Sequence, residues 1–131
     1  EQCDGVSYDK FVTDYPDAAK WWDSQDPFAS TFPGGETVAA FHYRVGQAVR
    51  RAVEEHAGKT IVVACHGGVI DCVFRQFLRT PSIGVFQLHP VNTSVTEFTQ
   101  LRPDKWQVER YNDSVHLIGL PSSTPVDEPD T

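Results

Sequence analysis

The sequence predicts an α/β layer fold on three observations. An apolar, β-branched run over Thr60–Ala64 ends at His66 and two glycines, and a helical pattern begins at once. This order is typical of a buried parallel strand that delivers a side chain to the carboxyl edge of a sheet. A long amphipathic helix precedes the run and strand-like segments follow it. Helices and strands in this order favour helices layered on a sheet.

Three helical segments are expected before the central run. Residues 7–13 form a short helix with Ser7 as its N-cap, and residues 17–22 form a further helical turn. Residues 37–56 form the clearest helix, because their apolar side chains recur every three to four positions, and Gly58 ends it. The apolar face comprises Val38, Phe41, Val45, Ala48, Val49, Ala52 and Val53.

A helix over residues 68–78 is expected directly after the glycines. Three strands follow, over residues 85–88, 94–101 and 106–111, and the last two form a hairpin across residues 102–105.

Two segments are predicted to lie outside these layers. Residues 23–35 are punctuated by proline and glycine, and large rings in or beside them are expected to pack as a cap segment. These rings belong to Trp21, Trp22, Phe28 and Phe32. Residues 121–131 are rich in Pro, Ser, Thr and acidic residues, which predicts a disordered tail.

Composition excludes several classes of protein. A chain of 131 residues suits one domain, and its net charge of −7 argues against a nucleic-acid partner. No apolar run reaches membrane-spanning length. Three cysteines without C-x-x-C spacing indicate neither a disulfide framework nor a zinc site and favour a reducing cytoplasm. The chain contains no methionine, so we expect that an upstream segment has been removed.

His66 is the leading candidate for chemistry. Ligands of open α/β sheets bind where strands end and helices begin, and the adjacent glycines remove side chains from the approach. A helix N-terminus there would attract an anion such as a phosphate group. The alternative is a histidine that only fills the core.

Other candidates are weaker. A cysteine-phosphatase loop starting at Cys65 would need an arginine where Asp71 stands, and Arg75 lies four positions too late; Cys65 is therefore expected to face the core. Three histidines, His42, His56 and His89, lack metal-ligand spacing. We expect the first two on a helix surface.

Several segments of the chain form a set in a characteristic order: the opening Glu1–Gly5, Pro33–Glu36, Phe41–Val45, Thr60–Ile70, Asn92–Glu97, and Tyr111–Asp113 with His116 and Leu117. In this order they resemble the histidine phosphatase superfamily, also called phosphoglycerate-mutase-like. The resemblance covers residues 1–118, but the family's Arg-His-Gly motif, which carries the nucleophilic histidine, is absent, as is a later arginine of the phosphate pocket.

The resemblance implies a three-layer α/β/α sandwich with a mostly parallel central sheet, whose N-terminal part is missing. Residues 1–118 would be the C-terminal part of the domain, with a cap segment at about 15–35 and a disordered tail over 119–131. His66 matches the second catalytic histidine, and Glu1 matches the general acid of some phosphatase branches. From the same resemblance, Gly67, Gly68 and Trp22 would contact substrate, with no metal or cofactor.

The expected function is hydrolysis of a small phosphomonoester through a phosphohistidine formed on the missing upstream segment. The alternative is an inactive, truncated domain that binds a phosphorylated ligand or a partner chain. An N-terminal companion fragment or a second copy would then complete the sheet. A mutase is disfavoured because few basic residues precede Gly35.

Overall fold

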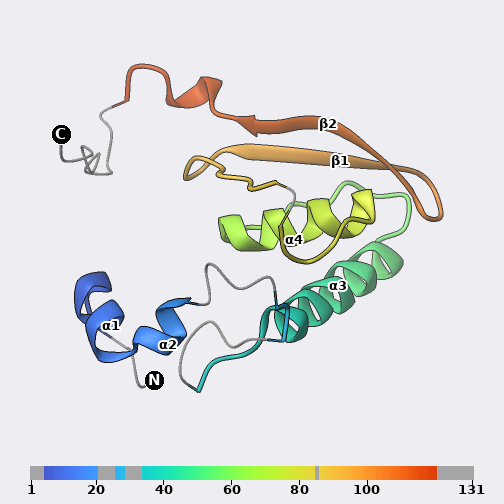
Figure 1. The fold of residues 1–131 in the computed structure, drawn as a ribbon. Helices are drawn as coiled ribbons and strands as arrows, with labels where there is room; N and C mark the ends of the chain where they lie inside the picture. The colour runs from blue at the N-terminus through green and yellow to red at the C-terminus, as the bar shows by residue number, and fades with distance from the viewer. Residues whose placement is uncertain (1–4, 21–25, 29–33, 85, 121–131) are drawn as a thin grey trace.

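The computed structural model describes residues 5–20, 26–28, 34–84 and 86–120. Within them the β1–β2 hairpin lies along one side of α4, and α3 lies along the other (Figure 1). The elements in chain order are α1 (Tyr8–Asp14), α2 (Pro16–Ala19), α3 (Val38–Glu55), α4 (Gly67–Leu78), β1 (Val95–Arg102), β2 (Lys105–Asp113) and a short 3-10 helix (Val115–Leu117).

The first two helices begin at residues suited to a helix N-terminus. Ser7 is the N-cap of α1, as predicted, and its hydroxyl accepts a hydrogen bond of 3.4 Å from the Lys10 N–H. Pro16 begins α2, because its fixed φ suits the first helical position. The helical turn expected over 17–22 therefore starts earlier, and its last two residues lie outside the described part of the chain.

Helix α3 agrees with the expected range to within a residue at each end. Its N-cap Thr37 accepts from the Ala40 N–H at 3.1 Å. Val38 and Val45 of its apolar face are buried. Gly46 allows α4 to approach closely, because a Cβ atom there would lie 2.7 Å from the Gln76 Oε1 atom.

The strand predicted over 60–64 does not pair with any other strand in the described structure. Residues 60–66 carry no regular secondary structure, and Val62 and Val63 are 94% and 64% exposed. Cys65 is exposed as well, so the prediction that it faces the core is wrong here. One physical reason explains both the exposed valines and the exposed cysteine. A parallel strand is buried only when neighbouring strands and covering helices are present, and the sheet of the described residues contains only β1 and β2.

The predicted hairpin is confirmed, with β1 and β2 antiparallel and Gln100 opposite Trp106. Its turn places Asp104 at a φ of 61°, a left-handed conformation that Asp tolerates better than most residues. The strand predicted over 85–88 is wrong for residues 86–88, which form a loop. The sheet in the described residues is therefore two-stranded and antiparallel, and the mostly parallel sheet is not seen there.

Aromatic side chains join the hairpin to α4. Phe77 stacks on Trp106, with ring centroids 4.0 Å apart. Phe74 meets Phe98 and Tyr111 edge-on at 4.8 and 5.3 Å, geometries that aromatic pairs favour. We call these five residues the aromatic cluster.

No helix among the described residues has both the length and the apolar character needed to cross a membrane.

Replacing Phe74 by Ala should lower the free energy of unfolding by about 3–5 kcal/mol, because the ring is buried in the aromatic cluster. Tyr43→Ala is the matched control, since its ring is 71% exposed, and it should change stability by less than about 1 kcal/mol. Urea denaturation followed by circular dichroism measures both. Equal losses in the two variants would contradict the assigned core.

Candidate functional site

His66 occupies the N-cap of α4, the position at which the sequence places the candidate anion site. Its backbone is extended, with φ −89° and ψ 159°, and its side chain makes no capping hydrogen bond. Its carbonyl accepts from the Val69 N–H at 2.9 Å. The residue is exposed, so the imidazole is open to an approaching ligand and is not sealed inside the core.

The two glycines after His66 differ in their surroundings. A Cβ atom on Gly67 would lie 3.2 Å from Cγ of Pro90, whereas one on Gly68 would find its nearest neighbour, Cζ of Phe41, at 3.9 Å. Gly67 thus lets the ring of Pro90 pack directly against the first turn of α4. Gly68 has no side chain, so the helix backbone at that position is not covered by one.

Pro90 belongs to a loop that the hairpin holds in place. The N–H of Val91, the next residue, donates to Oδ1 of Asn112 at 2.7 Å. Asn112 itself has a φ of 55°, and its N–H donates to Oγ1 of Thr96 at 3.2 Å. Sequence reasoning missed Asn112. Its one local signal is that Asn is among the few residues that adopt left-handed φ readily.

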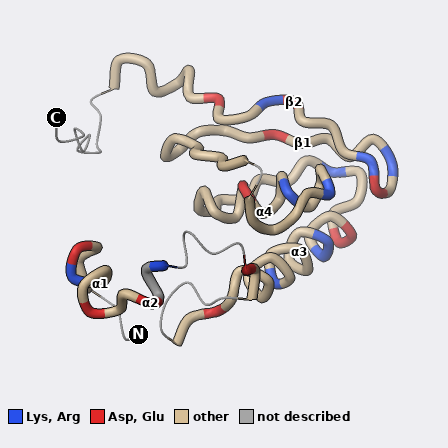
Figure 2. The backbone as a smooth tube through the Cα atoms, in the orientation of Figure 1, with Lys and Arg blue, Asp and Glu red and all other residues tan. Residues whose placement is uncertain are grey.

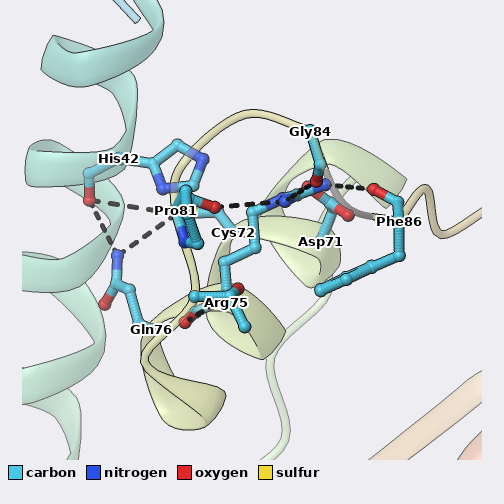
Figure 3. Close-up of polar contacts among 9 residues, drawn as sticks. His42, Asp71, Cys72, Arg75, Gln76, Pro81, Gly84 and Phe86 are labelled. Atoms are coloured by element: carbon cyan, nitrogen blue, oxygen red, sulfur yellow. Dashed lines mark hydrogen bonds and ion pairs between the residues drawn. The ribbon is translucent and has the colours of Figure 1, made fainter.

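Asp71 and Arg75 form a largely buried ion pair one turn apart on α4 (Figure 3), with Nε to Oδ2 at 2.6 Å. Arg75 is 5% exposed. The sequence analysis considered it only as a misplaced cysteine-phosphatase arginine. An i,i+4 spacing of Asp and Arg on a helix is the signal that could have revealed the pair.

The other side chains with possible chemistry do not join His66. Cys72 is fully buried, and burial raises the pKa of its thiol to about 11, which leaves it inert as a nucleophile at neutral pH. His42, expected on the surface, is partly buried because its helix packs against α4, and burial lowers its pKa. Among the described residues no group of three or more His, Cys, Asp or Glu could hold a metal ion.

Two predicted site residues cannot be placed. Glu1 and Trp22 lie outside the described residues, as do Trp21 and Phe32 of the expected cap segment. Phe28, the ring of that group that the structure describes, is 74% exposed and therefore covers little.

A broad open groove of about 900 Å³ lies elsewhere, between α3, the C-terminal end of α4 and the hairpin turn. Its lining includes Gly46, Arg50, Gln76 and Trp106 and none of the predicted site residues. It lies at the opposite end of α4 from His66.

Positive charge is sparse on α4. Figure 2 shows Lys and Arg on α1, α2, α3 and β2 as well as at the hairpin turn, and on α4 the one basic residue is Arg75, in its last turn. At the start of α4, a phosphate group would therefore meet the helix dipole and the imidazole, and no basic side chain of the first two turns.

The two glycines should respond differently to a methyl group. Gly67→Ala presses on the rigid Pro90 ring and should make the protein less stable than Gly68→Ala by about 1 kcal/mol or more. Gly68→Ala gains helix propensity and fills open space. Thermal unfolding of both variants checks this, and equal stability would mean that Pro90 does not pack on this turn.

The chain is similar to known proteins in sequence and in fold. The sequence model of the histidine phosphatase superfamily (branch 1) matches residues 1–114. Among curated proteins, "Phosphoglycerate mutase-like protein 4" of Arabidopsis thaliana is 31% identical over 86% of this chain and 48% of its own length. The "Metal-independent phosphoserine phosphatase" of the same plant is 29% identical over 66% of this chain and 34% of its own length.

A solved structure, Bacillus stearothermophilus YhfR, superposes with a TM-score of 0.71 at 26% identity, covering 86% of this chain and 55% of that one. The chain thus spans about half the length, or less, of the relatives it matches. With the match over residues 1–114, these findings show that the chain belongs to the histidine phosphatase superfamily.

Proposed function

We propose that this chain is part of a phosphomonoester hydrolase that works through a phosphohistidine, with the nucleophilic histidine on a segment outside the given sequence. The observation that carries the proposal is the exposed imidazole of His66 at the N-terminus of α4. Membership of the superfamily supports it, and so does the relative whose name is metal-independent phosphoserine phosphatase.

In the proposed reaction, the neutral nucleophilic histidine attacks phosphorus, so an N–P bond forms while the ester P–O bond breaks. Glu1 gives its carboxyl proton to the leaving oxygen. Water then attacks phosphorus, the N–P bond breaks, and the Glu1 carboxylate takes up the proton of the attacking water. His66 and the first N–H groups of α4, at Gly67 and Gly68, stabilise the charge on the transferring phosphoryl oxygens.

The proposal extends to the fold of the complete domain. We infer that residues 60–64 pair there as a central parallel strand of a three-layer α/β/α sandwich. The exposure of Val62 and Val63 supports this, because their apolar surface is the kind that a sheet and its covering helices bury. On this view residues 1–118 belong to the domain and residues 15–35 form the cap segment that contacts the leaving group, with Trp22 within it.

The substrate class is a small phosphomonoester, with water rather than a second substrate as the acceptor. The sparse positive charge before Gly35 supports a phosphatase over a mutase, since a mutase must retain a charged intermediate. A cytoplasmic location, suggested by the cysteine content, stays a prediction.

A second candidate function is supported by the exposed run itself. Val62 and Val63 would suit a truncated, inactive domain that binds a phosphorylated ligand and completes its sheet with a companion fragment or a second copy. This alternative predicts that the natural full-length polypeptide binds an aryl phosphate and does not turn it over.

Replacing His66 by Ala in the natural full-length polypeptide should lower kcat for p-nitrophenyl phosphate about 10²–10³-fold, because a donor to the transition state is lost. His56→Ala is the matched control, since His56 is an exposed histidine at the other end of the preceding loop, the C-cap of α3. Steady-state kinetics check both variants. Undiminished turnover by His66→Ala would remove this residue from the site.

Replacing Glu1 by Gln should slow hydrolysis of an alkyl phosphate far more than that of p-nitrophenyl phosphate. General acid catalysis contributes about 10²–10⁴-fold, but p-nitrophenolate leaves without needing a proton. The ratio of the two rates is the measurement, with Glu55→Gln on the exposed end of α3 as control. Equal slowing of both substrates would rule out Glu1 as the proton donor.

A further inference from the structure

The side chain of Arg75 binds backbone carbonyl groups of the loop that follows α4. Its Nη1 atom donates to the carbonyl oxygens of Pro81, at 3.1 Å, and Gly84, at 2.7 Å. Nη2 donates to the carbonyl oxygen of Phe86, and the guanidinium carbon lies 4.4 Å from the centroid of the Phe86 ring. Asp71 holds Nε from the other side, so the guanidinium is tied both to its own helix and to the loop (Figure 3).

This arrangement suits positioning better than stabilisation. A buried ion pair adds little net stability, because the cost of removing two charges from water offsets their attraction. A guanidinium, however, presents five donors in a rigid plane. Asp71 fixes that plane, and the three carbonyl groups of the loop lie where its remaining donors point.

The loop held by Arg75 leads to the candidate site. Four residues after Phe86 comes Pro90, whose ring lies against Gly67. On the far side of Pro90 the N–H of Val91 is bound by Asn112 of β2. Pro90 is thus anchored by Arg75 before it and by Asn112 after it, and it meets α4 at the residue next to His66.

We propose that Arg75 is a positioning residue, which acts through its contacts with Pro81, Gly84 and Phe86 to set Pro90 against Gly67 and so fix the orientation of His66 and the first turn of α4. The inference rests on the proposed function for its effect on catalysis. Its structural core, a coupling between Arg75 and the Gly67–Pro90 contact, is independent of that function.

The test compares Arg75→Lys with Arg50→Lys in the natural full-length polypeptide. Lysine keeps the charge but cannot hold Asp71 and three carbonyl groups in one plane. Arg75→Lys should lower kcat for p-nitrophenyl phosphate at least about 10-fold, because misplacing a catalytic group by an ångström is costly, while KM changes less than about 2-fold. Arg50 is exposed on α3, and its substitution should leave both constants unchanged.

A double-mutant cycle with Pro90→Ala separates positioning from a general loss of structure. If Arg75 acts through Pro90, the double variant should lose little more activity than Arg75→Lys alone. Additive losses, or a loss of activity that only follows the unfolded fraction, would overturn the proposal. Pro90→Ala also serves where Arg75→Lys does not fold, and full activity in that variant would overturn it equally.

NMR distinguishes failure of this inference from failure of the proposed function. The amide resonances of Gly67 and His66 should shift in Arg75→Lys and not in Arg50→Lys, whether or not the protein hydrolyses phosphate esters. Shifts without any wild-type turnover would leave the coupling standing and refute the phosphatase. Unshifted resonances in an active enzyme would refute the coupling alone.

Discussion

The packing of α4 between the hairpin and α3 is the constraint on which the rest of the structure depends. The aromatic cluster secures the hairpin side. On the other side Gln76 donates to the carbonyl of His42 at 2.8 Å, across the close approach that Gly46 allows. A helix held on two sides cannot turn or slide without breaking one of these contacts. Contacts near the C-terminal end of α4 therefore help to set the position of its N-terminal end, where His66 lies.

The hairpin positions the candidate site through two separate sets of contacts. It fixes α4 through the aromatic cluster, and through Asn112 it fixes Val91 and hence Pro90. The same pair of strands therefore fixes the position of both residues of the Gly67–Pro90 contact. An antiparallel hairpin is well suited to this task, since its register pairs Phe98 with Val108 and is secured by its own short turn.

The parts of the fold that the sequence predicts well are those that local interactions specify. The N-cap Ser7 and the period of α3 are visible in a short window, and so is the hairpin. The strand at 60–64 has a clear pattern, but its pairing depends on strands that the described residues do not supply. His66 and its glycines could be identified from their place after that run. Arg75, Asn112 and Pro90 could not, because their roles arise from contacts between segments distant in sequence.

Charge limits what the described residues can do by themselves. A helix N-terminus contributes about half a positive charge, and an imidazole adds at most one, whereas a phosphomonoester carries close to two negative charges near neutral pH. Arg75 cannot make up the difference, because its guanidinium is already committed to Asp71 and the loop carbonyl groups. Tight binding of a phosphate at His66 would therefore require cationic groups beyond the helix dipole, the imidazole and Arg75. At the proposed site, the described residues supply the scaffold, one imidazole and the helix dipole. The segment that carries the proposed nucleophile would then also have to carry positively charged side chains.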